Sequence, residues 1–304
     1  MRIRAALAAG GVLAAALLSG CGGSSPGRAA APPAPSPAGA SPAGSSDRAF
    51  GQLEQRYGAR LGVYAFDTGN GRELAYRADE RFAFASTGKA LAAGVLLGKA
   101  SDAELAKRVT YRQEDVLSWA PVTSQHVADG MTVHDLLAAE LDHSDNTAAN
   151  LITAELGGPD AVQQALRALG DATTNVVRTE PTLNEATPGD ARDTSTARQL
   201  ATDLRQFALG TALPEARRRM LTDLLAANTT GDPYIRAGVP GGWRVGDKTG
   251  NAGYGTRNDI AVVWPAGDRA PLVVALLSER GTKDARSDDD LLANATGVAI
   301  AGLG

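Results

Sequence analysis

The chain of 304 residues is long enough for one or two domains with a substantial buried core. Its 43% hydrophobic and 21% charged residues exclude a collagen-like or wholly disordered protein. The formal net charge is −4, and it becomes more negative if Arg2 and Arg4 are cleaved off, so phosphate backbones are repelled and we expect no nucleic-acid partner.

The first 20 residues have the pattern of an export signal. Arg2 and Arg4 precede an apolar stretch, residues 5–18, that is too short to span a hydrocarbon core of ~30 Å. The only cysteine, Cys21, follows this stretch and has no partner for an internal disulfide. Leu18-Ser19-Gly20-Cys21 resembles the bacterial lipobox, in which the cysteine is lipidated and becomes the first residue after cleavage. We therefore predict a signal peptide over residues 1–20 and a lipid on Cys21; a plain secretory signal is the alternative.

This resemblance implies an exported protein that a lipid anchors to the cell envelope, on the outer face of the plasma membrane or the periplasmic side of the outer membrane. No other segment reaches about 18 uninterrupted apolar residues, so we expect attachment by lipid and not by a spanning helix. Residues 22–46 are Gly, Ser, Pro or Ala at every position but Arg28, a composition with nothing to bury. We predict that residues 21–46 tether a globular domain of residues 47–304.

The N-terminal part of this domain is predicted to form a helix and a hairpin. The helical pattern runs from Ala49 to Tyr57. Two short β-type runs, Leu61–Phe66 and Glu73–Tyr76, flank Asp67-Thr68-Gly69-Asn70-Gly71, a segment rich in turn-forming residues. We expect these runs to be adjacent antiparallel strands.

The rest of the domain is predicted to be helical and then to return to strands. From Ser86 onward the pattern is helical for about 160 residues, with apolar stripes at helical spacing such as the one between Val162 and Leu169. Two β-type runs, 260–264 and 272–277, precede a final helix over 288–303. Strands at both ends imply one antiparallel sheet of N- and C-terminal segments, flanked by helices, beside an all-α subdomain. The predicted fold class is α+β.

Three short polar motifs stand out. Ser86 and Lys89 are three residues apart, so on a helix they share a face, and a serine needs such a neighbouring base or cation to become a nucleophile. Ser144-Asp145-Asn146 lies at a predicted helix junction. Asp247-Lys248-Thr249-Gly250 precedes a β-type run, where a lysine and a hydroxyl suit an anionic ligand group. Each motif alone is also what an ordinary helix cap or solvated strand end looks like.

In this order, S-x-x-K, S-D-N and K-T-G form the signature of the penicillin-recognising serine enzymes. Residues 178–184 (RTEPTLN), followed by Asp190 and residues 192–194, resemble the Ω loop of class A β-lactamases, which transpeptidases lack. Residues 119–122 and 129–133 also resemble class A segments. The chain resembles this family over nearly all of residues 48–304, and the resemblance implies an active site between the sheet and the all-α subdomain.

The resemblance implies roles for five residues in catalysis. The serine corresponding to Ser86 attacks the β-lactam carbonyl, and water then hydrolyses the acyl-enzyme. Either Lys89 or, through a bound water, Glu180 takes the proton of this serine, and the choice stays open. Glu180 is implied to be the general base of deacylation, Ser144 the proton donor to the departing nitrogen, and Lys248 the cation that eases this transfer.

The resemblance also implies a substrate-binding set. Asn184 holds the deacylating water together with Glu180, while Asn146 binds the acylamino carbonyl of the substrate and touches Lys89. The N–H groups of Ser86 and Asn251 form the oxyanion hole. In this set, Trp119 is the aromatic residue at the edge of the cleft, and Gly250 is the third residue of the K-T-G motif. Thr249 and Arg257 are implied to bind the substrate carboxylate.

Arg178 and Asp193 correspond to a pair that bridges the base of the Ω loop, and the Glu180–Pro181 bond resembles a cis peptide of the family. Class A carbapenemases commonly carry a disulfide between the positions that match Ala85 and Ala252. Neither residue is cysteine here, which disfavours dedicated carbapenem hydrolysis.

We therefore expect hydrolysis of penicillins and cephalosporins through a serine acyl-enzyme, which gives antibiotic resistance, with the balance between the two substrates left open. We expect no cofactor and no metal, because His126, His134 and His143 are scattered in the sequence. The family implies a monomer. One alternative is a peptidoglycan transpeptidase or carboxypeptidase, against which Glu180 and Asn184 count. The other is a catalytically idle lipoprotein that binds wall fragments, which usually has lost one of the five catalytic residues.

Overall fold

The computed structural model describes residues 42–304. Cys21, the signal peptide predicted over residues 1–20 and residues 21–41 of the predicted tether lie outside the described residues. Helix α1 (Pro42–Tyr57) begins before the predicted start at Ala49, because Ser46 and Phe50 are buried where α1 packs on the C-terminal helix. None of the helices in the described part is long and apolar enough to cross a membrane.

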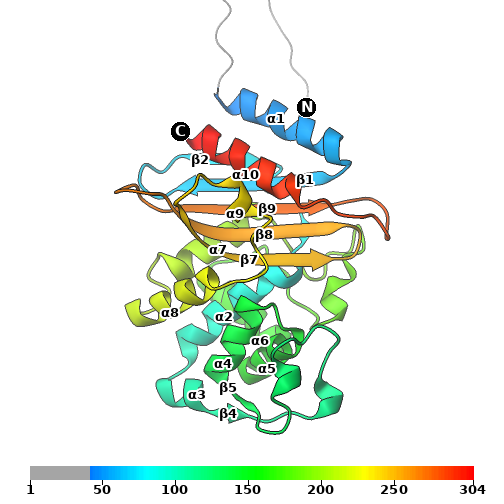
Figure 1. Cartoon of the computed structure of the whole chain (residues 1–304), viewed down its shortest axis with the longest axis vertical. Helices are drawn as coiled ribbons and strands as arrows, with labels where there is room; N and C mark the ends of the chain where they lie inside the picture. The colour runs from blue at the N-terminus through cyan, green and yellow to red at the C-terminus, as the bar shows by residue number, and fades with distance from the viewer. Residues whose placement is uncertain (1–41) are drawn as a thin grey trace, which may run out of the picture. The chain divides into compact units, whose positions relative to one another are not determined.

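An antiparallel sheet of five strands divides the domain (Figure 1). The strand order is β2-β1-β9-β8-β7, and the strands are β1 (Arg60–Asp67), β2 (Glu73–Tyr76), β7 (Arg244–Ala252), β8 (Thr256–Trp264) and β9 (Leu272–Glu279). β1 pairs with β9 along its whole length, from Arg60 opposite Glu279 to Asp67 opposite Leu272. The predicted sheet of N- and C-terminal segments is confirmed.

β7 is the strand that the sequence pattern did not reveal. The prediction that Asp247–Gly250 precedes a strand is wrong, because these residues lie inside β7. These residues are buried on both faces of the strand although they are polar or small, so no alternating apolar pattern marks them. The strand places the K-T-G motif along the edge of the sheet.

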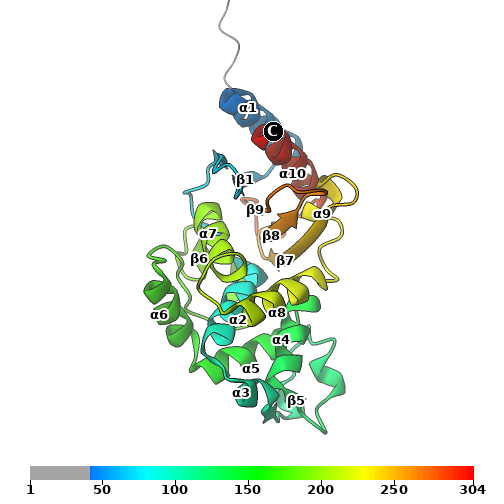
Figure 2. The ribbon, with the colours of Figure 1, turned by 90° about the vertical axis from the view of Figure 1, so that its left-hand side faces the viewer.

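Helices cover both faces of the sheet. One face carries α1 and α10 (Asp290–Leu303), which pack side by side, and the short α9 (Ile235–Gly238) (Figure 2). The other face carries α7 (Ala197–Ala208), followed by α2 (Gly88–Lys99) and α8 (Glu215–Ala226). The apolar side chains accordingly form two clusters, one on each side of the sheet.

The all-α subdomain lies beyond α2, as predicted. Its other helices are α3 (Asp102–Ala106), α4 (Val133–Asp142), α5 (Asn146–Leu156) and α6 (Pro159–Leu169). Two small ladders tie the connections: β3 (Phe82–Ala83) pairs with β6 (Thr194–Ser195), and β4 (Arg108–Val109) pairs with β5 (Met131–Thr132). Single 3₁₀ turns cover Ala85–Thr87, Gln113–Asp115, Thr123–Gln125 and Thr182–Glu185.

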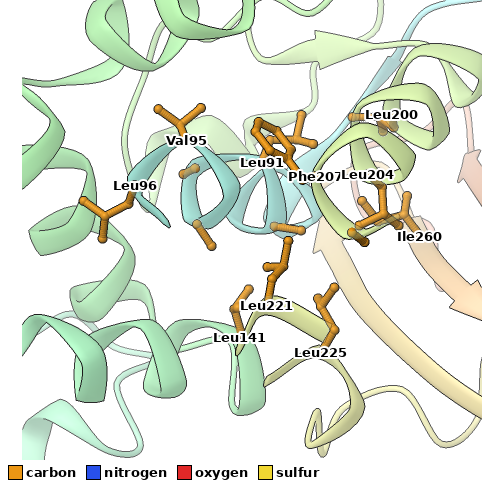
Figure 3. Close-up of a cluster of buried hydrophobic side chains, with 14 of the residues drawn as sticks. Leu91, Val95, Leu96, Leu141, Leu200, Leu204, Phe207, Leu221, Leu225 and Ile260 are labelled. Carbon is orange, nitrogen blue, oxygen red and sulfur yellow. The ribbon is translucent and has the colours of Figure 1, made fainter. Parts of the chain in front are cut away.

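Helix α2 is the centre of the larger apolar cluster. All its residues from Lys89 to Leu97 are buried, as expected for a helix that is apolar on every side. Figure 3 shows Leu91 and Val95 of α2 close to Phe207, which comes from α7. The two helices approach closely at Gly94, where a Cβ atom would lie 2.5 Å from Cγ of Phe207.

We predict that Gly94→Ala destabilises the domain by ~1–3 kcal/mol, because the ring of Phe207 must move out of a packed core. The matched control is Gly297→Ala on α10, where the glycine is exposed and no atom lies within 4 Å of an added Cβ. That variant is expected to be more stable by ~0.5–1 kcal/mol, because alanine favours the helix. Urea unfolding followed by circular dichroism measures both, and a Gly94→Ala protein as stable as its parent contradicts the packing argument.

Candidate active site

Ser86 lies in a 3₁₀ turn that leads directly into α2. The preceding residue, Ala85, has a φ of 50°, a left-handed backbone conformation that residues other than glycine rarely adopt. The turn is pressed against β7: a Cβ atom on Gly250 would lie 3.0 Å from the carbonyl oxygen of Phe84. Gly250 therefore allows the K-T-G strand to pass beside the serine.

Lys89, in the first turn of α2, contacts three other predicted site residues. Its Nζ donates to the carbonyl oxygen of Ser144 at 2.8 Å and to Oδ1 of Asn146 at 2.6 Å, and it lies 3.1 Å from Oε1 of Glu180. Oγ of Ser144 is a further acceptor at 3.3 Å. Burial lowers the pKa of Lys89, while the carboxylate of Glu180 raises it. An ammonium group satisfies these acceptors, since its three protons all find oxygens.

Glu180 contacts both residues of the first motif. Its Oε1 accepts a hydrogen bond from Oγ of Ser86 at 3.3 Å, and Nδ2 of Asn184 donates to Oε2. The side-chain amide of Asn150 holds the main chain of Glu180 in both directions, accepting from its N–H and donating to its carbonyl, each at 2.9 Å. Sequence reasoning did not single out Asn150, because an asparagine inside a helix has no local signal for this contact.

The base of the Ω loop is held by the predicted pair. Nε of Arg178 donates to Oδ2 of Asp193 at 2.5 Å, and the fully buried Asp193 also accepts from the N–H groups of Val177 and Arg178, each at 2.9 Å. The Glu180–Pro181 peptide bond is cis, as the resemblance implies. Glu180 thus sits on a loop that is fastened at its base and again at its own backbone.

The S-D-N motif is placed by its middle residue. Asp145 is fully buried and accepts from the N–H of Thr123 and, as the N-cap of α5, from the N–H of Ala148, both at 2.9 Å. The flanking Ser144 has a φ of 56°. This anchoring turns Ser144 and Asn146 toward Lys89, so the role of Asp145 is structural.

Lys248 is buried in β7 beside this cluster. Burial, together with the positive charge of Lys89, lowers the pKa of Lys248 to about 7. Its Nζ donates to the carbonyl oxygen of Thr249 at 3.0 Å, and within residues 42–304 no hydrogen bond joins it to Ser144. Thr249 follows Lys248 in β7, and its Oγ1 lies 2.5 Å from Oγ1 of Thr230. No local pattern in the sequence singled out Thr230.

Seven of the predicted site residues, together with Thr230, line a cleft of about 260 Å³. Its lining consists of Ser86, Trp119, Ser144, Asn146, Asn184, Thr230, Thr249 and Asn251. Trp119 is 55% exposed at the mouth, where its Nε1 donates to the carbonyl oxygen of His143 at 3.1 Å. Arg257 does not line this cleft: it lies opposite Asn251 on β8, and its Nε donates to Asp289 at 3.1 Å.

The arrangement suits covalent acyl transfer: a serine hydroxyl is bonded to a carboxylate, which is paired with a buried ammonium group. A group of His, Cys, Asp and Glu side chains that could hold a metal ion is absent from the described part of the chain.

Comparison with known proteins identifies the family. Residues 46–300 match the β-lactamase enzyme family. The chain belongs to this family. It is similar to a β-lactamase of Bacillus licheniformis, with 53% identity over 84% of this chain and 82% of that one, and to β-lactamase FAR-1 of Nocardia farcinica, with 49% identity over 99% and 96%.

Solved structures agree with this assignment. A halotolerant bacterial β-lactamase is 50% identical, with a TM-score of 0.83 over 84% of this chain and 98% of that one. The class A β-lactamase of Clostridium kluyveri gives the same identity, TM-score and coverage. The protein is thus a class A serine β-lactamase, a hydrolase that opens the cyclic amide of β-lactam antibiotics and so gives antibiotic resistance.

We predict that Asp193→Asn destabilises the enzyme by about 3 kcal/mol, because Arg178 loses its buried partner. The matched control is Asp190→Asn, which removes a carboxylate from the same loop but one that pairs mainly with the exposed Arg192. We expect the control to leave the midpoint of thermal unfolding nearly unchanged. Equal midpoints for both variants contradict the proposed clamp at the base of the loop.

Proposed function

We propose that the enzyme opens penicillins and cephalosporins through an acyl-enzyme on Ser86, and that Glu180 activates the water that releases the product. The position of the Glu180 carboxylate carries this proposal: its Oε1 is 3.3 Å from Oγ of Ser86 and 3.1 Å from Nζ of Lys89, while Asn184 binds its Oε2. A general base must lie within hydrogen-bond reach of the proton that it takes, directly or through one water.

In acylation, Oγ of Ser86 bonds to the carbonyl carbon of the lactam, and its proton passes to Glu180. Lys89 is less suited to take this proton, because its ammonium protons are engaged with Ser144, Asn146 and Glu180. The N–H groups of Ser86 and Asn251 bind the developing oxyanion, an interaction for which loss of one donor costs about 3 kcal/mol.

The C–N bond then breaks, and the nitrogen leaves with a proton from Ser144. Ser144 regains a proton from Glu180 by way of Lys89, so Glu180 is a carboxylate again before deacylation. Lys89 lies next to this hydroxyl, at 3.3 Å. The pKa of Lys248 is about 7, so this group exchanges a proton readily near neutral pH and can resupply the site. Thr249, supported by Thr230, binds the substrate carboxylate, and Arg257 adds positive charge from the neighbouring strand.

In deacylation, a water between Glu180 and Asn184 attacks the ester carbonyl. Glu180 takes a proton from this water and passes it to Oγ of Ser86 as the bond to that oxygen breaks, which restores the serine and the carboxylate. A hydrogen bond already joins the two side chains, so their positions are fixed and together they can bind the water. Such a base on an Ω loop favours hydrolysis over the slow acyl-enzyme of a peptidoglycan transpeptidase.

Glu180→Ala is expected to be trapped as the acyl-enzyme on Ser86, with kcat reduced at least ~10²-fold. Without this carboxylate, Lys89 loses the strongest influence that raises its pKa, and Glu140 and Asp145 oppose the effect of burial more weakly. The amine can then serve as the base for acylation, whereas deacylation has no substitute. Hydrolysis of nitrocefin and benzylpenicillin, together with intact-mass detection of the adduct, measures both steps.

The matched control is Glu185→Ala, which removes a half-exposed carboxylate from the same loop and is expected to keep the parent rate. Ser86→Ala is expected to form no adduct. Turnover of Glu180→Ala at the parent rate contradicts the assignment of the base. A parent enzyme that accumulates the adduct without turnover supports the transpeptidase alternative, and a folded parent that forms no adduct supports the idle lipoprotein.

We also propose that the enzyme is an exported, monomeric lipoprotein anchored through Cys21, with residues 1–20 removed as a signal peptide. The support is the lipobox-like sequence that ends at the only cysteine, followed by a segment of Gly, Ser, Pro and Ala that suits a tether. A lipid at the end of such a tether leaves the catalytic domain free to meet β-lactams at the membrane surface.

Cells that express Cys21→Ser are expected to lose incorporation of labelled fatty acid into the protein, while those that express the control Ser24→Ala keep it. The Cys21→Ser enzyme is expected to have unchanged kcat/KM, because no active-site residue is altered. Fractionation and fatty-acid labelling measure the anchor. Equal labelling of the two variants contradicts lipidation at Cys21.

A further inference from the structure

A second buried acid, Glu140, lies behind the active-site lysines. Glu140 is in α4 and is fully buried, and neither of its carboxyl oxygens has a hydrogen-bond partner within residues 42–304. An ionised carboxylate in such a place is costly, so the neutral form is favoured. Burial raises the pKa of Glu140 to about 8.

This carboxyl group faces a cavity that it shares with the active site. The cavity of about 50 Å³ is lined by Glu140, Lys89, Asn150 and Glu180, by Arg178, which is paired with Asp193, by three threonines and by apolar side chains, most of them from α2, α5 and α6. A water molecule needs ~10–15 Å³ and at least two polar partners, and this space offers both. Water in the cavity can therefore connect Glu140 to the pair of Lys89 and Glu180.

The charges around Glu140 come from four elements. Lys89 on α2 and Lys248 on β7 favour the ionised carboxylate, whereas Asp145 at the start of α5 and Glu180 on the Ω loop oppose it. The other helices that pack on α4 are α3 and α8, and their charged side chains are bonded elsewhere: Asp102 with Arg217, Arg219 with Glu215, Asp223 with Arg244, Glu104 with Ser101, and Arg218 with the carbonyl oxygens of Gly210 and Leu213. Glu155 of α5 pairs with Lys107. The balance at Glu140 is thus one between two lysines and two carboxylates.

We propose that Glu140 is a positioning residue that is neutral in the resting enzyme and whose ionisation, with the proton passing to water in the cavity, sustains the positive charge of Lys89 as pH rises. Glu140 touches no substrate atom, and its effect is exerted through Lys89, with which it shares the cavity. The coupling is reciprocal: the charge of Lys89 eases the ionisation of Glu140, and the anion in turn raises the pKa of Lys89. The inference rests on the proposed function insofar as a charged Lys89 is needed for turnover.

The test compares Glu140→Gln with the parent in the full chain. Glutamine keeps the shape of the neutral carboxyl group but cannot become an anion, so Lys89 loses its proton at lower pH. We expect the alkaline limb of the kcat/KM profile for benzylpenicillin to move to lower pH by roughly one unit, with kcat/KM at pH 6 within about threefold of the parent.

Asp203→Asn is the matched control. Asp203 on α7 is also fully buried, has one oxygen without a partner and a pKa raised to about 8, but its charged neighbours are Asp171 and Arg167 and not the lysines. Both acids bind a proton more tightly in the folded state than when unfolded, so each lowers stability as pH rises from about 5 to 8. Both variants are therefore expected to gain thermal stability relative to the parent over that range, but only Glu140→Gln should shift the activity profile.

A folded Glu140→Gln enzyme with the parent profile overturns the proposal, as does an equal shift in Asp203→Asn. If Glu140→Gln does not fold, ¹³C NMR of the parent labelled at the glutamate carboxyl decides: one glutamate that titrates near pH 8 supports the proposal, and titration of all glutamates below about pH 6 overturns it. Failure of the proposed function is distinguishable, because it appears in the Glu180→Ala adduct and not in these profiles.

Discussion

The site depends on the hydrogen bonds and the ion pair that the buried ammonium group of Lys89 makes. A charge in the interior is tolerated only when opposite charge and hydrogen-bond acceptors surround it, and Lys89 obtains them from two separate segments. The S-D-N motif supplies two residues and the Ω loop supplies Glu180. The same contacts that pay for burying the charge therefore bring the catalytic groups together around one atom.

Two other buried acids fix the loops that carry these groups. Asp145 and Asp193 each accept backbone N–H groups as well as a side-chain donor, so each carboxylate fastens a loop along its main chain. Each loop contains one residue with a left-handed backbone: Ser144, next to Asp145, and Asp193. Such a conformation costs of order 1 kcal/mol or more. The fastening contacts offset this strain, and the result is a site whose geometry exists before substrate arrives.

Charge balance explains why the site can cycle protons. Lys89 and Lys248 repel each other, and burial disfavours both charges, while the nearby carboxylates favour them. Burial and the charge of Lys89 bring the pKa of Lys248 to about 7, a value at which a group can both give and take a proton near neutral pH. Glu180 uses this balance directly in our proposal, and Glu140 adjusts it from the cavity that it shares with Lys89.

The sequence by itself determined the local features: the hairpin of β1 and β2, the helical segment that begins near Ser86 and continues through Lys89, and the three motifs with the Ω loop that led to the correct family. These features are short-range, so the order of residues is enough to reveal them. It also indicated the pairing of Arg178 with Asp193, through resemblance. Tertiary structure alone decided that Asp247–Gly250 is part of a strand, that Arg257 is turned to Asp289, and that Asn150, Thr230 and Glu140 stand around the site. Each of those depends on burial and on contacts between distant segments, and neither leaves a local pattern in the chain.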